Sequence, residues 1–292
     1  MKIVLYGRLT KNTCFSALAS FFRFLDLEKI EYTVYHLYAE ELLNSEVLKD
    51  YKLPTFRSYQ EIQGFDFLYS IGGDGTILQS VPFAIEANLA ILGVNVGRLG
   101  FLAGVSQYDL ITATQDLQRG AWREESRSLV EVETNAPIFG MHNYGLNEVT
   151  IHKSNTNEMI TVHTFVNGEF MNSYWADGLI IATPTGSTAY SLACGGPIIF
   201  PISDVFVLTP IAPHSLTVRP VILPDRVVIS FEIESRSGQA LIAIDNRTIL
   251  VNNSIEIAIK KSSFKVRLVK LKEQSYFMTL RKRLNWGVDT RN

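Results

Sequence analysis

The sequence lacks most features that mark secreted, membrane-spanning and zinc-binding proteins. Its 292 residues include only two cysteines, Cys14 and Cys194, which form neither a CxxC pair nor a zinc-ligand pattern. No stretch approaches the ~18 unbroken apolar residues of a membrane helix, and the apolar run at the N-terminus is too short for a signal peptide. We therefore expect a cytoplasmic protein in a reducing compartment, with no membrane partner.

Several functional classes are excluded in the same way. The net charge is −2 at pH 7, so no broad basic surface favours nucleic acid as a partner. The five histidines show no metal-ligand spacing, and we predict no protein-built metal site. The chain also lacks the GxGxxG fingerprint of ordinary dehydrogenases and the Walker GxxxxGK motif of P-loop enzymes.

The composition that remains is that of a globular protein, with 47% hydrophobic and 19% charged residues. Strand and helix patterns alternate over residues 1–100, which predicts an α/β N-terminal domain with a Rossmann-like parallel sheet. From about Trp122 the pattern changes to short alternating strands. Residues 101–271 are therefore predicted to form an all-β, sandwich-like C-terminal domain.

The sequence also predicts the bounds of one helix, two strands and one hairpin. Residues 38–48 have a weak helical pattern, and two separate strands are expected at 255–259 and 264–271. Asn167 and Gly168 predict a hairpin, because this pair suits the two φ > 0 positions of a type I′ turn.

The sequence Gly-Gly-Asp-Gly-Thr at residues 72–76 follows a buried-strand pattern and precedes a helix for which Thr76 is the expected cap. A strand, a glycine turn and a helix N-terminus form an anion site, because glycine lets successive N–H groups approach a phosphate. Asp74 is unusual there, since a carboxylate beside phosphates has to act on a nucleophile, a metal or a sugar hydroxyl. An ordinary strand-to-helix turn is the alternative.

A second group of candidates lies in the β-rich part. Asn147 and Glu148 precede a strand; an amide beside a carboxylate can recognise an adenine edge and a ribose hydroxyl, although a polar strand start is more common. Asp177 precedes another strand, which leads into residues 183–193. Their hydroxyls form either a hydrogen-bonding shelf on which Tyr190 could stack, or a helix cap.

Taken together and in order, these segments resemble the NAD kinase family in its bacterial form. The glycine pentapeptide is shared with lipid kinases of the diacylglycerol and sphingosine type, whereas residues 183–190 with Asn147 and Glu148 are specific. The matching segments are residues 72–76, 93–102, 147–148, 177–178, 183–190, 195–197, 213–216 and 219–220.

The resemblance implies transfer of the γ-phosphoryl of ATP to the 2′-hydroxyl of the adenosine ribose of NAD, with a divalent cation such as Mg²⁺. It also implies a dinucleotide site between the two domains and a tail, residues 272–292, that packs back on the first. Homodimers or homotetramers are usual in such a family. A lipid kinase and a non-catalytic dinucleotide sensor are the alternative functions.

The resemblance also assigns roles to residues. Asp74 takes the role of catalytic base and contacts NAD. Asn147 and Glu148 hold the adenosine part, and Asp177 holds the nicotinamide end. The phosphate-binding residues are Gly72, Gly73, Gly75 and Thr76. The other NAD-binding residues are Gly75, Thr185, Ser187, Thr188, Ala189, Tyr190, Ser191, Ala193 and Arg247.

One segment departs from the family pattern, in which an Asp-Gly pair is followed by a polar residue. This chain has Asp245, Asn246 and Arg247 instead. Asparagine tolerates the left-handed conformation, so the turn can still form. Arg247 either adds a cation near the new 2′-phosphate or points to water.

Overall fold

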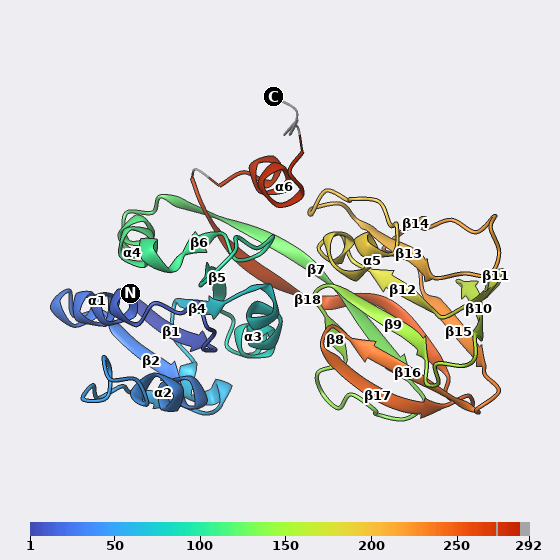
Figure 1. The fold of residues 1–292 in the computed structure, drawn as a ribbon, viewed down its shortest axis with the longest axis horizontal. Coiled ribbons are helices and arrows are strands. Elements are labelled where there is room, and N and C mark those ends of the chain that lie inside the picture. The colour runs from blue at the N-terminus through green and yellow to red at the C-terminus, as the bar shows by residue number, and fades with distance from the viewer. Residues whose placement is uncertain (273, 287–292) are drawn as a thin grey trace. The chain divides into compact units, whose positions relative to one another are not determined.

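The computed structural model describes residues 1–272 and 274–286, and the chain divides into two compact units (Figure 1). Unit 1 comprises Met1–Ser126 and the chain from Val266 onward, and unit 2 comprises Arg127–Lys265. The chain passes from one unit to the other within strands β7 (Trp122–Thr134) and β18 (Ile257–Leu271).

Unit 1 contains a parallel sheet, as predicted for an α/β domain. The pairings run in the order β3, β2, β1, β4, β5, and the second half of β18 adds to β5 in parallel. Strand β4 is buried along its whole length, as expected for a strand covered on both faces. The strands are β1 (Lys2–Gly7), β2 (Glu31–Tyr35), β3 (Thr55–Phe56), β4 (Phe67–Gly72), β5 (Ala90–Asn95) and β6 (Val105–Ser106).

Helices cover both faces of this sheet. Leu18, Phe22 and Leu25 of α1 pack in one core with alternate residues of β1, β4 and β5. On the other face, the Ile77 side chain of α3 lies so close to Gly93 that a Cβ there would be 2.6 Å from it. The helices are α1 (Phe15–Leu27), α2 (His36–Leu43), α3 (Asp74–Glu86), α4 (Leu110–Gln118) and α6 (Tyr276–Leu284), with 3₁₀ turns at Tyr59–Ile62 and Gln107–Asp109.

Two expectations for this unit need correction. Helix α2 ends at Leu43 instead of residue 48, because the Ser45 hydroxyl donates to the carbonyl of Leu42 and competes with the helical bonds. Residues 101–126 were expected in the second domain but group with unit 1. The reason is that α4 buries Leu110 and Leu117 in the core of unit 1.

Unit 2 is β-rich, as predicted, and its two sheets share one core. In one sheet β11, β10, β15 and the first half of β18 are neighbours, with β7 and β8 alongside. The other has the order β14, β13, β12, β9, β16, β17 and is antiparallel throughout. The bounds are β8 (Tyr144–Gly145), β9 (Glu148–Lys153), β10 (Ile160–Val166), β11 (Glu169–Ala176), β12 (Gly178–Ala182), β13 (Val205–Ile211), β14 (Val221–Pro224), β15 (Ile229–Glu234), β16 (Gln239–Ile244), β17 (Arg247–Asn252), a 3₁₀ turn (Gly186–Thr188) and α5 (Tyr190–Ala193).

The hairpin predicted at Asn167 and Gly168 is confirmed, since their φ angles are 51° and 83°. The prediction of two strands at 255–259 and 264–271 is wrong, because β18 is one strand of 15 residues. Its polar middle continues as a strand because Lys260 pairs with Glu133 and Lys261 with Asp225.

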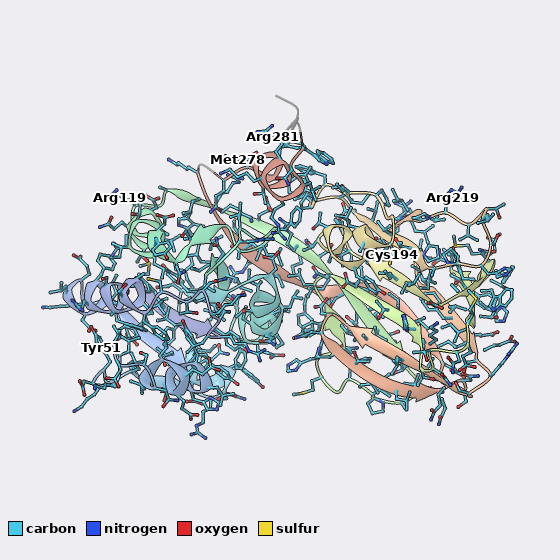
Figure 2. All side chains as sticks on the ribbon, in the orientation of Figure 1. Tyr51, Arg119, Cys194, Arg219, Met278 and Arg281 are labelled. Carbon is cyan, nitrogen blue, oxygen red and sulfur yellow. The ribbon has the colours of Figure 1, made fainter. Side chains whose placement is uncertain are left out.

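The described part of the C-terminal tail contacts unit 1. Leu280 of α6 is buried, the Arg283 guanidinium lies 5.5 Å from the centre of the Phe101 ring, and the Gln274 amide donates to the carbonyl of Gly104 at 2.9 Å. Figure 2 shows Met278 and Arg281 on this helix. Residues 273 and 287–292 of the expected tail lie outside the described residues. Within the described chain, no helix is both long and apolar enough to span a membrane.

Helix α1 offers a matched test of the core. Leu25 is fully buried, whereas Leu27 on the same helix is 82% exposed. We expect Leu25→Ala to lower the free energy of unfolding by about 2–5 kcal/mol, because a cavity adds to the lost burial. Leu27→Ala should change it by less than ~0.5 kcal/mol. Urea unfolding followed by circular dichroism checks both, and equal effects would contradict the packing described.

Candidate functional site

The glycine loop of unit 1 joins β4 to α3. Helix α3 begins at Asp74 with Gly73 as its N-cap, so the expectation that Thr76 caps the helix is wrong. Thr76 is instead in the first turn, where its hydroxyl oxygen accepts the N–H of Gly73 at 3.3 Å. A Cβ on Gly72 would lie 2.1 Å from that oxygen, so this hydrogen bond requires glycine at position 72.

The Asp74 carboxylate accepts three backbone N–H groups from another loop. Phe101 N–H donates to Oδ2 at 2.8 Å, and Leu102 and Ala103 donate to Oδ1 at 3.0 Å each. A Cβ on Gly100 would lie 2.0 Å from Oδ1, so only glycine fits there. A carboxylate has about four acceptor positions, and one position on Oδ2 therefore stays available for a ligand.

In unit 2, a second carboxylate holds backbone in the same way. Asp245, at φ 51° between β16 and β17, accepts the N–H groups of Leu146 and Asn147 at 2.8 Å each and of Glu148 at 3.2 Å. Burial raises the pKa of Asp245, and the three N–H donors act against that rise. Asp245, which keeps the aspartate of the family's Asp-Gly pair while Asn246 replaces the glycine, thus fixes the segment that carries Asn147 and Glu148.

Arg247 acts on the other side of the same segment. Its guanidinium donates to the carbonyl oxygens of His142 and, at 2.6 Å, Tyr144. Asp245 therefore accepts hydrogen bonds from backbone N–H groups of the segment 142–148, and Arg247 donates hydrogen bonds to backbone carbonyls of the same segment. The direct contact between Arg247 and NAD stays a prediction.

Glu148 is buried, and its Oε2 has no hydrogen-bond partner among the described residues. Burial, and next the charge of Asp245, raise the pKa of Glu148 to about 8, while the backbone N–H of Tyr190 opposes the rise. Buried polar atoms are rarely left without a partner, so the site is chemically suited to a ligand hydroxyl.

The segment 183–193 lies directly against this turn. The Thr183 N–H donates to the carbonyl of Asn147 at 2.8 Å, and the Thr183 hydroxyl donates to that of Leu146 at 2.6 Å. A Cβ on Gly186 would lie 2.0 Å from the Asn147 oxygen. The two specific motifs of the sequence are thus one structural unit.

Several hydroxyls of this segment are used within the protein. Ser187 donates to the carbonyl of Pro184 at 2.7 Å, and Ser191 pairs with Thr209 at 2.8 Å, with both serines buried. These hydroxyls shape the shelf from inside, and their contacts with NAD stay predictions.

Other members of the segment differ in their exposure. The Thr188 hydroxyl donates to the carbonyl of Thr185 at 3.2 Å, and the Thr185 hydroxyl accepts from Arg127. Ala189 is half-buried, whereas Tyr190 and Ala193 are exposed. Cys194, labelled in Figure 2, follows α5 directly. Tyr190 is thus the ring of this segment that a ligand can reach.

Asp177 lies near Tyr190. Burial first, then the neighbouring Cys194 and Asp177, raise the pKa of the Tyr190 phenol, with a smaller contribution from Glu148. The residues predicted for the adenosine part, for stacking and for the nicotinamide end therefore come together in unit 2. Sequence reasoning missed Lys153, whose Nζ lies 2.6 Å from Asp177 Oδ1. The only sequence feature that could have drawn attention to Lys153 is its position at the end of the strand that begins at Glu148.

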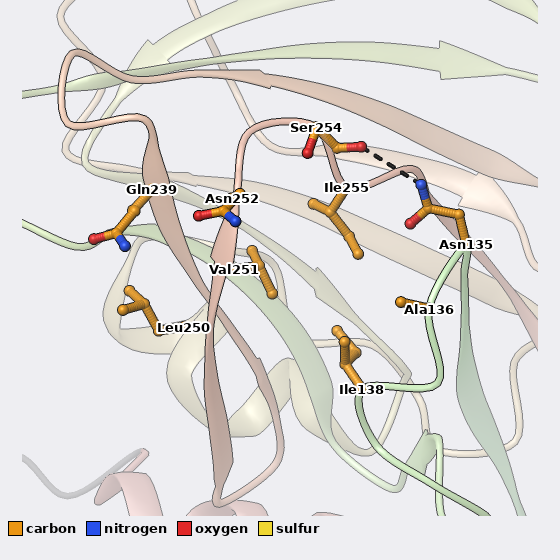
Figure 3. Close-up of a pocket in the computed structure, with 9 residues that line it drawn as sticks. All are labelled: Asn135, Ala136, Ile138, Gln239, Leu250, Val251, Asn252, Ser254 and Ile255. Carbon is orange, nitrogen blue, oxygen red and sulfur yellow. Dashed lines mark hydrogen bonds between the residues drawn. The ribbon is translucent and has the colours of Figure 1, made fainter.

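Figure 3 shows a different pocket of unit 2, with a volume of about 420 Å³. Its lining is apolar and amide-rich, and Asn135 donates there to the carbonyl of Ser254 at 3.5 Å. None of the predicted site residues lines it, and its described lining residues include no His, Cys, Asp, Glu or Lys side chain.

Two family models match the chain: the ATP-NAD kinase N-terminal domain over residues 16–121 and the ATP-NAD kinase C-terminal domain over residues 146–271. A curated NAD kinase of Cytophaga hutchinsonii is 41% identical over 292 residues, and one of Bacteroides fragilis is 36% identical over 291. Both matches cover 100% of each chain.

Two solved structures have the same fold as this chain. The yeast NADH kinase complexed with NADH has a TM-score of 0.84 at 25% identity, covering 100% of this chain and 89% of that one. An NAD kinase from Archaeoglobus fulgidus in complex with ATP has a TM-score of 0.73 at 23% identity, covering 97% and 99%, and supports the fold alone. Because both domain models match and the relatives align over their full length, the chain belongs to the NAD kinase family.

Proposed function

We propose that this enzyme transfers the γ-phosphoryl of ATP to the 2′-hydroxyl of the adenosine ribose of NAD, giving NADP and ADP. The observation that carries the proposal is the Asn147–Glu148 turn, held by Asp245 and packed against Thr183 and Gly186. The turn presents a buried carboxyl oxygen that lacks a partner among the described residues, as a ribose-binding group requires. The yeast relative complexed with NADH supports the dinucleotide ligand, and the two ATP-NAD kinase domain models support ATP as the donor.

In the proposed reaction the protein mainly positions groups, because phosphoryl transfer passes through a loose transition state. Asn147 and Glu148 hold the adenosine. In the glycine loop, the N–H groups of Asp74 and Gly75 are left for phosphate, because Gly73 and Thr76 use theirs within the loop. The open acceptor position of Asp74 takes the hydrogen bond of the 2′-hydroxyl. The bond from O2′ to the γ-phosphorus forms as the β,γ-bridging P–O bond breaks, the proton passes to Asp74, and the electron pair leaves with ADP.

A divalent cation, with Mg²⁺ as the expected ion, is part of the proposal. Among the described residues no group of three His, Cys, Asp or Glu side chains is arranged to hold a metal. Because the open acceptor position of Asp74 is proposed for the 2′-hydroxyl, Mg²⁺ would be held mainly through the substrate phosphates and the several waters that this ion usually keeps. When bound, the ion neutralises charge on the phosphates.

The alternative functions are less well supported. A lipid kinase needs an apolar acceptor pocket, whereas the segment 183–193 contains buried hydroxyls. Purified protein given Mg²⁺-ATP should form NADP from NAD in a coupled assay. With radiolabelled ATP it should leave detergent-solubilised diacylglycerol unlabelled. Binding of NAD without turnover would indicate a sensor and overturn the proposal. The cytoplasmic location and the homodimer or homotetramer stay predictions.

Asp74 is expected to carry the chemistry. We expect Asp74→Asn to lower kcat at least ~10²-fold, the lower end of what a lost general base costs. The affinity for NAD should change much less, because most proposed NAD contacts lie in residues 147–193. Steady-state kinetics and calorimetry measure the two effects.

Two checks accompany this variant. Asp66→Asn changes an exposed carboxylate just before β4 and should keep full activity. The melting temperature shows whether Asp74→Asn has only disturbed the 101–103 loop. A kcat within about threefold of wild type would remove Asp74 from the catalytic role, since that is under ~1 kcal/mol.

The raised pKa of Glu148 should make the free energy of unfolding depend on pH. Its pKa is about 8 in the folded protein and ~4.3 in an unfolded chain, so between these values only the folded state binds the proton. The stabilisation is complete below the lower value and is lost as pH rises toward 8. Relative to Glu148→Gln, wild type should lose roughly 3 kcal/mol of unfolding free energy between pH 5 and 8.

Urea unfolding at several pH values measures this difference. Glu169→Gln changes an exposed carboxylate of the same unit and should leave the wild-type pH profile unaltered. Parallel profiles for wild type and Glu148→Gln would contradict the raised pKa of Glu148.

A further inference from the structure

We propose that Lys153 sets how strongly this enzyme distinguishes the oxidised dinucleotide NAD from the reduced NADH. The inference rests on the proposed function together with the expectation, from the family resemblance, that Asp177 holds the nicotinamide end. Lys153 ends β9 and Asp177 stands between β11 and β12. Lys153 Nζ lies 2.6 Å from Asp177 Oδ1, and the Lys153 N–H also donates to the Asp177 carbonyl at 3.0 Å.

This ion pair is partly shielded from water. The Lys153 side chain is 15% exposed and that of Asp177 30%, and Lys153 Nζ also donates to the carbonyl of Thr156 at 3.2 Å. For Asp177 Oδ2, the described residues supply no hydrogen-bond partner, so this oxygen can accept from a ligand. Partial burial makes the charge of each partner felt more strongly than at an open surface.

The chemistry of the ligand makes these two charges relevant. The nicotinamide ring carries a positive charge when oxidised and none when reduced, whereas the phosphates and riboses are the same in both forms. An aspartate alone would favour the cationic ring. Lys153 offsets that preference, because a carboxylate and an ammonium at 2.6 Å present little net charge.

The neighbouring titratable groups leave this pair as the main source of charge. Burial first, with Cys194 and Asp177 next, raises the pKa of Tyr190, so its phenol is neutral at pH 7. Burial and Asp245 raise the pKa of Glu148 to about 8, so that carboxyl is mostly neutral as well. Burial also raises the pKa of the Cys194 thiol, which keeps it neutral. Lys153 was not among the residues that the family resemblance assigns to the site.

Three variants test the inference: Lys153→Met, Asp177→Asn and the double variant. The measurement is the ratio of the dissociation constants for NADH and NAD, obtained by calorimetry on the full chain. Lys153→Met should raise the preference for NAD about three- to tenfold, which is the size of one partly screened charge. Asp177→Asn should lower it by a similar factor, and the double variant should return near wild type.

A loss of structure cannot imitate this pattern, because unfolding or loosening of the site would weaken both dinucleotides together. Lys260→Met serves as the control, since Lys260 is another paired lysine of unit 2 that is 38% exposed. A ratio within twofold of wild type in both single variants, or a shift in the same direction, would overturn the proposal. Failure of the proposed function would be seen separately, as wild-type protein that forms no NADP.

Discussion

Two carboxylates, Asp74 and Asp245, each accept three consecutive backbone N–H groups, and both candidate site loops depend on these bonds. Loops rich in glycine have few side chains with which to fix themselves, and their buried N–H groups need acceptors. A carboxylate supplies enough acceptor positions for three donors at once. In unit 1 it orders residues 101–103, and in unit 2 it orders the turn that carries Asn147 and Glu148.

The same arrangement explains how the site combines rigidity with reactivity. In unit 1, Asp74 keeps one acceptor position, which is proposed for the acceptor hydroxyl, while its three hydrogen bonds fix the direction of the carboxylate. In unit 2, burial and next the charge of Asp245 raise the pKa of Glu148 to about 8, and its buried Oε2 has no partner among the described residues. Arg247 then completes the support by binding carbonyls of the same segment. Positioning of this kind is the main contribution that a protein makes to phosphoryl transfer.

Much of the fold could be predicted from local sequence, whereas the long-range contacts of the candidate site could not. The parallel and β-rich parts, the Asn167–Gly168 turn and the position of the glycine loop follow from periodicity and glycine chemistry over a few residues. The partners of Asp74, Asp245 and Asp177 did not follow. Leu146, for example, lies 99 positions before Asp245, and no local pattern connects them. The continuity of β18 was missed for the same reason, since distant acidic residues pair with its lysines.

Hydrogen exchange tests most directly whether Asp245 orders the turn of residues 146–148, which is proposed to bind the dinucleotide. In wild type the amides of Leu146, Asn147 and Glu148 should exchange slowly. In Asp245→Asn, which loses one acceptor oxygen, at least one of the three should exchange much faster, and the affinity for NAD should fall. The amide of Ile151, inside the β9 ladders, should stay protected. Unchanged protection of all three amides together with weakened NAD binding would contradict the account.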